Sequence, residues 1–155
     1  GQENLETVKA DVQGVSKKLG RTLTYVVGKP GLDGHSNGSE QIAARARAAG
    51  MNVIYEGIRF TPEEIVAQAI ESRAHVVGLS ILSGPHLDLV RDTVHILREK
   101  GLKIPVVVGG IIPEADALAL RQMGVKRVYT PKDYRITQIT GDVVKVVEET
   151  LVNAG

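Results

Sequence analysis

The chain has 155 residues, of which 19 are Lys or Arg and 18 are Asp or Glu, so its net charge is +1 at pH 7. This balance gives no long-range field to attract nucleic acid or an anionic membrane. The absence of cysteine excludes disulfides, thiolate metal sites and cysteine nucleophiles. With no leader pattern and no apolar run of about 20 residues, the sequence predicts a cytoplasmic protein whose partners include neither nucleic acid nor a membrane.

Hydrophobic periodicity predicts an α/β fold. The first residues carry apolar positions on one helical face, so residues 1–20 are predicted to form a linker helix before one domain at 21–155. From Arg21 onward, short β-branched runs alternate with helical segments. The predicted strands are Thr22 to Gly28, Asn52 to Tyr55, His75 to Ser80, Ile104 to Val108 and Arg127 to Tyr129. The predicted helices are Ser39 to Ala49, Pro62 to Ser72, Pro85 to Lys100, Pro113 to Met123 and Ile139 to Val152.

Five strands followed by five helices, with short connections, favour a flavodoxin-like (Rossmann-like) doubly wound parallel sheet in the order 2-1-3-4-5. In that order the switch point lies between the first and third strands. Ligands of such sheets bind outside the carboxyl ends of the strands. The segments after Val27, Leu79 and Val108 are therefore the candidate ligand-binding segments.

The segment after the first strand has an unusual composition. Between Gly28 and Gly38 it holds four glycines and one proline, which lets the backbone turn sharply and approach a bulky ligand. Within it, Asp33 and His35 are two residues apart, a spacing that allows a carboxylate to accept a hydrogen bond from Nδ1 and leaves Nε2 free to bind a metal. The alternative is a solvated loop in which His35 is an ordinary surface residue and Asp33 caps a turn.

Three motifs together resemble a known family. Asp33-x-His35-x-x-Gly38 is followed by Ser80-x-Leu82 and then by Gly109-Gly110. The triple resembles cobalamin-binding domains that hold the cofactor with its benzimidazole base displaced and a histidine in its place. Each motif is weak alone, but all three fall at the carboxyl ends of the first, third and fourth predicted strands, where the switch point predicts a ligand.

The resemblance implies a role for each matching residue. His35 would coordinate cobalt, Asp33 would accept a hydrogen bond from the other ring nitrogen, and Lys29 would favour the ionised form of Asp33. Gly38 would leave room for the nucleotide tail of the cofactor, Ser80 would hydrogen-bond the displaced base, and Leu82 would pack on it. The full implied cofactor-binding set is Lys29, Asp33, Gly34, His35, Ser36, Gly38, Ser80, Leu82, Gly109, Gly110, Tyr129 and Thr130.

Longer segments narrow the resemblance. The stretches 28–38, 55–59, 78–84 and 129–133 look most like the carboxyl-terminal domain of ethylmalonyl-CoA mutase, in the methylmalonyl-CoA mutase family. This implies adenosylcobalamin, radical rearrangement of an acyl-CoA and a separate (β/α)8 domain or subunit that holds the substrate. The chain would then be an excised domain or a natural small subunit, inactive alone, dimeric in the holoenzyme and served by a G-protein chaperone.

Other interpretations remain open from the sequence. Within the same family, the alternatives are the cofactor module of a methylmalonyl-CoA mutase and the small subunit of a 2-hydroxyacyl-CoA mutase. A corrinoid methyl carrier is a second class, although carriers usually have a helical bundle that residues 1–20 are too few to form. A third class is a non-enzymatic flavodoxin-like module. Among the remaining histidines, His86 is a candidate contact for the corrin rim, whereas His75 and His95 are expected to be structural.

Overall fold

The computed structural model describes residues 4–30, 37–55, 59–81, 85–130 and 135–154. Its strands are β1 (Thr24–Pro30), β2 (Asn52–Ile54), β3 (Arg59–Phe60), β4 (Val76–Ile81), β5 (Val106–Gly110) and β6 (Arg127–Tyr129). Its helices are α1 (Leu5–Leu19), α2 (Asn37–Ala48), α3 (Pro62–Ser72), α4 (Pro85–Glu99), α5 (Glu114–Gln122) and α6 (Ile136–Ala154). No described helix is long and apolar enough to cross a membrane.

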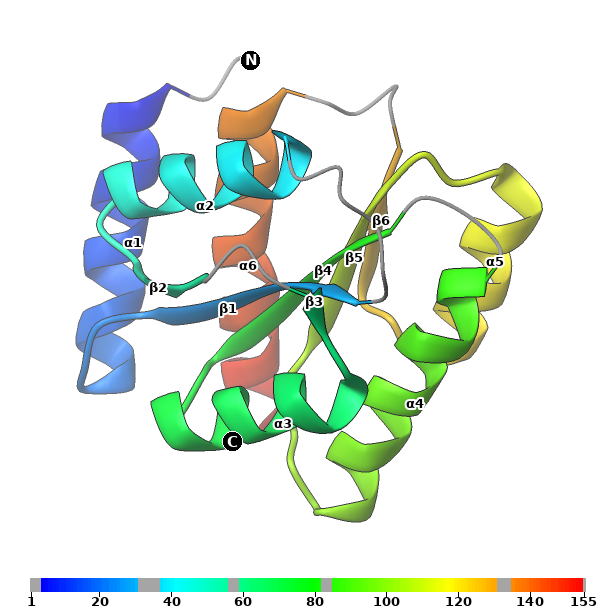
Figure 1. Cartoon of the computed structure of the whole chain (residues 1–155). Helices are drawn as coiled ribbons and strands as arrows, with labels where there is room; N and C mark the ends of the chain where they lie inside the picture. The colour runs from blue at the N-terminus through cyan, green and yellow to red at the C-terminus, as the bar shows by residue number, and fades with distance from the viewer. Residues whose placement is uncertain (1–3, 31–36, 56–58, 82–84, 131–134, 155) are drawn as a thin grey trace.

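All the strand pairs are parallel, and the main path of the sheet is β2-β1-β4-β5-β6. Without the two-residue strand β3, this is the predicted order 2-1-3-4-5, so the fold prediction is confirmed. β1 and β4 are adjacent at the centre, with Val27 opposite Gly78. The switch point therefore lies between them, and the carboxyl ends of β1, β4 and β5 share one edge of the sheet (Figure 1).

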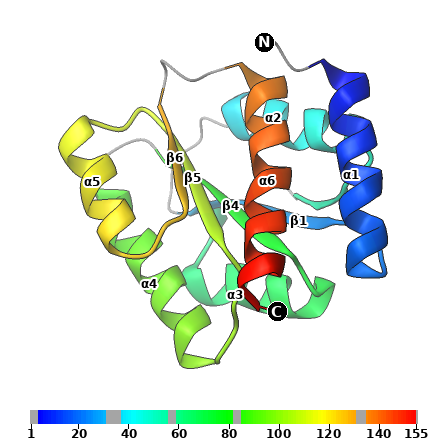
Figure 2. The same ribbon diagram turned by 180° about the vertical axis from the view of Figure 1, so that it is seen from behind.

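Helices cover both faces of the sheet (Figures 1 and 2). One core cluster joins α1, α2 and α6 to one face, and a second joins α3, α4 and α5 to the other. Alternate residues of each strand supply the two cores: Tyr25 and Val27 belong to the first, and Val26 to the second. Because both faces are buried, the central strands are continuous aliphatic runs rather than alternating polar and apolar ones.

The amino-terminal helix packs against the body of the domain. Val8, Val12 and Val15 are at most 2% exposed and belong to the same core cluster as α6. The side chain of Asn4 accepts a hydrogen bond from the Thr7 amide and so caps the helix start, while Gly20 ends it in a left-handed conformation. The predicted helix at 1–20 is thus present with one face buried, and the proposed domain boundary after it stays a prediction.

Two strands extend further toward the candidate site than predicted. β1 continues to Pro30 because β3, which the sequence analysis did not predict, pairs with its end at Lys29 and Pro30. β5 continues to Gly110 because Ser80 and Ile81 of β4 pair with Gly109 and Gly110. Lys29 and the glycine pair therefore belong to strands, not to the loops that follow them.

A buried hydrogen bond fixes His75 at the start of β4. The Thr24 amide donates to His75 Nδ1 at 2.9 Å, which requires a neutral ring. Burial, with the positive charges of Arg21 and Arg73, lowers the pKa of His75 to about 4. The structural role expected for His75 agrees with these contacts.

The lowered pKa of His75 predicts that the folded chain loses stability in acid. The folded-state pKa of about 4 lies below the ordinary value of 6.5, so neutral His75 contributes its full stabilisation of the fold above pH 6.5, and this contribution is lost as the pH falls toward 4. Allowing for solvent screening around a half-buried ring, we expect a loss of about 1–2 kcal/mol. Urea unfolding at pH 7 and pH 4.5 measures it. His75→Asn should reduce this pH dependence, whereas His95→Asn, on the exposed surface of α4, should not; equal slopes in all three proteins would contradict the assignment.

Candidate functional site

A small cavity lies at the carboxyl ends of the central strands, on the face that α2 and α6 cover. Its volume is about 20 Å³, room for about one water molecule. Its described walls come from four strands and two helices: Tyr25, Val27, Gly78, Leu79, Ser80, Val107, Gly109 and Tyr129 of the sheet, Ser39 and Ile42 of α2, and Ile139 of α6. A ligand larger than water enters this cavity only if its walls move apart.

Small residues create this space. Gly78 and Ser80 alternate along β4 on the same face, and Gly109 is opposite Ser80 in the neighbouring strand. A Cβ atom at Gly78 would overlap the hydroxyl of Tyr25 and lie 2.7 Å from its Cε1 atom. The ring of Tyr25 therefore occupies the volume that a side chain at Gly78 would need and forms one wall of the cavity.

Tyr129 forms the opposite wall and is held from α6. Its hydroxyl donates to Asp142 Oδ2, which also accepts from Arg127 Nε at 3.2 Å. Arg127 Nη2 further contacts Glu149 Oε1 at 2.6 Å. Burial, together with the adjacent Asp142 carboxylate, raises the pKa of Tyr129. The phenol is thus fixed as a neutral donor that ties β6 to α6.

A hydrogen bond links the first turn of α2 to the residue that follows β2. The hydroxyl oxygens of Ser39 and Tyr55 are 3.1 Å apart and share a hydrogen bond. Ser39 is only 1% exposed, although it lies in the first turn of the helix. The preceding residue, Gly38, is exposed, and a Cβ atom there would meet no atom of the described residues within 4 Å. The backbone at Gly38 is therefore open on the side where a side chain would project.

Lys29 is the most unusual charged residue at this edge. It is 5% exposed at the end of β1, and no ion pair links it to any residue that the structure describes. An ammonium group removed from water is costly unless an anion or several acceptors compensate it. This position therefore favours an anion or several hydrogen-bond acceptors close to the end of β1.

The structure brings only part of the predicted set together. Ser80, Gly109 and Tyr129 line one cavity, Gly110 ends the strand that Gly109 belongs to, and Thr130 directly follows β6. Five predicted residues lie outside the described residues: Asp33, Gly34, His35, Ser36 and Leu82. Within the described residues, no group of three His, Cys, Asp or Glu side chains could hold a metal ion.

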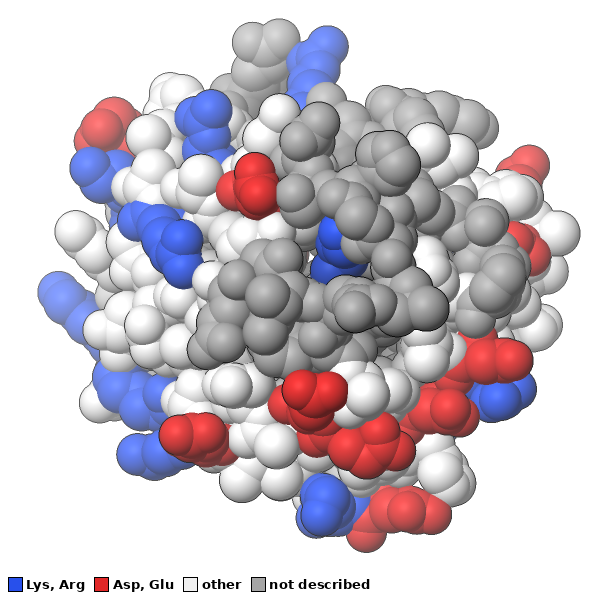
Figure 3. Space-filling view, in the orientation of Figure 1, with Lys and Arg blue, Asp and Glu red and all other residues white. Residues whose placement is uncertain are grey.

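The sequence analysis did not single out several cavity residues, notably Tyr25, Ser39 and Gly78. Gly78 could have been found from strand alternation. It lies two residues before Ser80, so both residues are on the same face of β4. The distribution of charge did not mark the site. In the view of Figure 3, basic side chains lie mainly on the side of α1 and α2, and acidic ones lie mainly over α3 and α4. No extended patch of one sign is visible in this view.

Comparison with known proteins identifies the family. The profile of the B12 binding domain matches residues 23–139. The chain is 57% identical over 152 residues to the ethylmalonyl-CoA mutase of Cereibacter sphaeroides, covering 98% of this chain and 23% of that protein. It is 42% identical to the 2-hydroxyisobutanoyl-CoA mutase small subunit of Aquincola tertiaricarbonis, covering 68% of this chain and 79% of the subunit.

Solved structures agree on the fold. A cobalamin-binding protein from Desulfitobacterium hafniense superposes with a TM-score of 0.67 at 23% identity, over 94% of this chain and 68% of that one. The methanol:cobalamin methyltransferase complex of Methanosarcina barkeri gives 0.66 at 21% identity, over 90% of this chain and 55% of that one. At such low sequence identity, these superpositions support only the shared fold. The family match and the mutase relatives carry the assignment: the chain belongs to the B12 binding domain family.

Proposed function

We propose that this chain holds adenosylcobalamin with its benzimidazole base displaced and His35 in its place, as the cofactor module of an acyl-CoA mutase. The observation that carries the proposal is the buried Lys29 at the end of β1, which favours a nearby anion. The sequence supplies Asp33 four residues later, within the motif that also contains His35. Lys29 would thus keep Asp33 ionised, and Asp33 would fix the tautomer of His35.

The cavity between the sheet and α2 is the proposed entrance for the nucleotide tail. Its walls combine the hydroxyls of Ser39 and Ser80 with two tyrosine rings and aliphatic groups. This chemistry suits a planar heteroaromatic base with a few hydrogen-bonding atoms. Because the cavity now has room for about one water molecule, α2 and the sheet would have to move apart when the tail enters.

Adenosylcobalamin supplies homolysis of its cobalt–carbon bond, and hence the radical that starts a carbon-skeleton rearrangement. The residues of this chain would bind and orient the cofactor and exclude water from the bound metal. His35 would donate the Nε2 lone pair to the metal, and Asp33 would hold the Nδ1 proton. No residue of this chain is proposed to touch the acyl-CoA.

We propose that the substrate is held by a separate (β/α)8 domain or subunit. The chain spans 23% of the length of the Cereibacter ethylmalonyl-CoA mutase and 21% of a second one, from Methylorubrum extorquens, whereas it spans 79% of a relative named as a small subunit. Ethylmalonyl-CoA is the favoured substrate because these two relatives are 57% and 56% identical over nearly the whole chain. A G-protein chaperone, a dimeric holoenzyme and a cytoplasmic location stay predictions of the resemblance.

Spectroscopy on the purified chain tests the axial ligand. With cob(II)alamin, we expect an electron paramagnetic resonance signal split by one imidazole nitrogen, and this splitting should change from triplets to doublets when the histidines carry ¹⁵N. His35→Ala should abolish the imidazole coupling, while the matched variant His95→Ala, whose ring pairs with Glu99 on the surface of α4, should retain it. Equal spectra from all three proteins, identical to free cofactor, would refute the proposal.

Gly38→Ala separates a ligand role from a structural one. In the folded chain the new methyl group has open space and improves the helix propensity of α2, so we expect a stability gain of about 0.5 kcal/mol. If the nucleotide tail passes over Gly38, cobalamin affinity should nevertheless fall by about tenfold. Chemical unfolding and absorbance titration measure the two effects. Gly14→Ala, equally open in α1, should raise stability and leave affinity unchanged; unchanged affinity in Gly38→Ala would place the tail elsewhere.

A further inference from the structure

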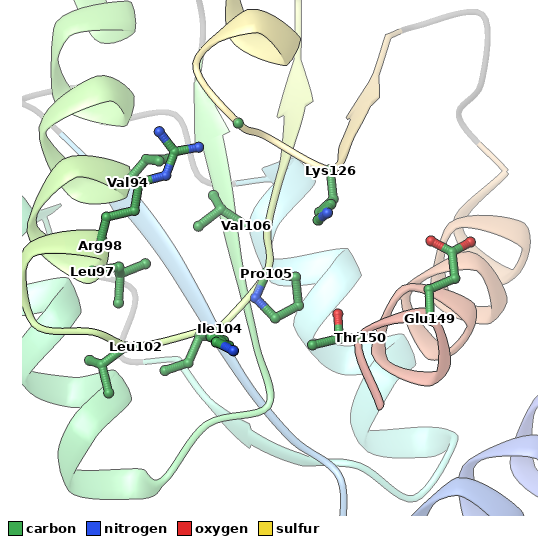
Figure 4. A pocket seen from close by; sticks show the side chains of 12 residues that line it. Val94, Leu97, Arg98, Leu102, Ile104, Pro105, Val106, Lys126, Glu149 and Thr150 are labelled. Atoms are coloured by element: carbon green, nitrogen blue, oxygen red, sulfur yellow. The ribbon is translucent and has the colours of Figure 1, made fainter. Parts of the chain in front are cut away.

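A second and larger cavity lies at the opposite edge of the sheet, at the amino-terminal ends of β5 and β6 (Figure 4). Its volume is about 400 Å³, within the usual range for small-molecule sites. α4 forms one side and the last turns of α6 form the other, while the connection from Leu102 to Pro105 closes the base. None of the residues in the motifs described above lines this cavity.

The inner surface of the cavity is apolar. Leu97, Val94 and Val106 are between 2% and 6% exposed, and their side chains lie on the α4 and β5 side of the space. Leu102 and Ile104 are half-buried and extend this surface along the connection before β5. A ligand here would bury hydrocarbon, which contributes about 0.8 kcal/mol per methylene group removed from water.

The rim of the cavity is cationic. Arg98, Lys103 and Lys126 line it, and none of them forms an ion pair with a residue that the structure describes. The acidic lining residue, Glu149, pairs with Arg127 at 2.6 Å. With three cations and one carboxylate among its lining residues, the rim carries a net positive charge beside an apolar surface.

The backbone positions one of these cations. Gly124 has a φ of 106°, and a Cβ atom there would overlap Arg98 Nη2 and lie 2.8 Å from its Cζ atom. The guanidinium of Arg98 thus packs directly on the turn before β6. The helix dipole accounts for a cation at Arg98, in the last turn of α4, but Lys103 and Lys126 belong to connecting segments outside the helices.

We propose that this cavity binds a small amphipathic anion, an aliphatic carboxylate, with its chain on the apolar surface and its carboxylate among Arg98, Lys103 and Lys126. Such a ligand satisfies both halves of the lining at once: hydrocarbon covers the surface around Leu97, and one negative charge meets the cations. The site is separate from the cofactor edge, so this inference does not depend on the proposed cobalamin chemistry.

Nuclear magnetic resonance titration of the ¹⁵N-labelled chain with hexanoate tests the site. We expect saturable shifts of the Lys103, Gly124 and Lys126 amides, with a dissociation constant on the order of 1 mM for so small a ligand. Acetate, which has the charge without the chain, and hexanol, which has the chain without the charge, should each bind about tenfold more weakly or worse.

Two variants and one control decide the role of the cations. Lys126→Gln, at an exposed position, should weaken hexanoate binding by about tenfold, as should Arg98→Gln, whereas Arg91→Gln on the outer surface of α4 should have no effect. Absence of shifts with hexanoate, or shifts unchanged in both cavity variants, would overturn the proposal. Shifts that depend on protein concentration without hexanoate would also overturn it, by assigning the surface to a second copy of the chain.

Discussion

Replacing Gly110 by alanine is expected to lower the free energy of unfolding by about 3 kcal/mol or more. A Cβ atom at this position would overlap the carbonyl oxygen of Ile81 in the neighbouring strand, and the backbone φ of 150° is one that side-chain-bearing residues rarely adopt. The backbone fixes the position of the Cβ atom, and the oxygen it meets is itself a backbone atom, so no rotamer change relieves the overlap. The carboxyl ends of β4 and β5 would have to separate, and cobalamin binding should be lost with them.

Gly101→Ala is the matched control for this variant. Gly101 also has a positive φ, of 70°, but a Cβ atom there has open space. Its cost should therefore be limited to backbone strain, about 1 kcal/mol. Urea unfolding of both variants separates the two contributions. A Gly110→Ala variant no less stable than Gly101→Ala would show that the strand ends are not in the close contact described.

Gly78→Ala is expected to destabilise the chain by about 2–3 kcal/mol through Tyr25. The added methyl would overlap the tyrosine hydroxyl and crowd two ring carbons at 2.7 and 2.9 Å. Since Tyr25 is 3% exposed, its ring has little room to withdraw. The displacement would also distort the cavity beside Ser80, so the affinity for cobalamin should change together with stability.

A double-mutant cycle tests this coupling. Tyr25→Val alone should leave a cavity and cost about 2–3 kcal/mol, but it should also remove most of the penalty of Gly78→Ala. The double variant should therefore be more stable than the sum of the two single effects predicts. Thermal or urea unfolding of the four proteins gives the interaction free energy. Strict additivity would indicate that the Tyr25 ring does not occupy the space over Gly78.

The type and order of the main elements could be predicted from sequence because both cores leave clear periodic signals. In the structure, Thr61 and Glu64 form the capping box that starts α3, and this start agrees with the predicted helix from Pro62. The ends of strands were less predictable. β1 reaches Pro30 only because β3 pairs with it, and a two-residue strand such as Arg59–Phe60 has no periodicity to detect.

The motif around His35 predicts a ligand at the carboxyl edge of the sheet, where the small cavity lies, and the role of His35 itself stays a prediction. The contribution of Tyr25 could not be predicted, because it depends on how its ring lies over Gly78, a tertiary contact between residues 53 positions apart. Likewise, nothing local distinguishes the buried Lys29 from a surface lysine before the strand pairing is known. The ligand roles of the residues outside the described ranges stay predictions.

The sheet order has a consequence for biosynthesis. β1 pairs with β4, which is distant in sequence, as well as with β2. Residues of β5 and β6 complete the sheet side of the cavity. The strand residues at the cofactor edge therefore extend from Tyr25 to Tyr129. A nascent chain emerging from the ribosome therefore lacks this edge until β6 has been made, and such non-local pairing forms late in folding. Cofactor loading would accordingly require that synthesis has passed β6.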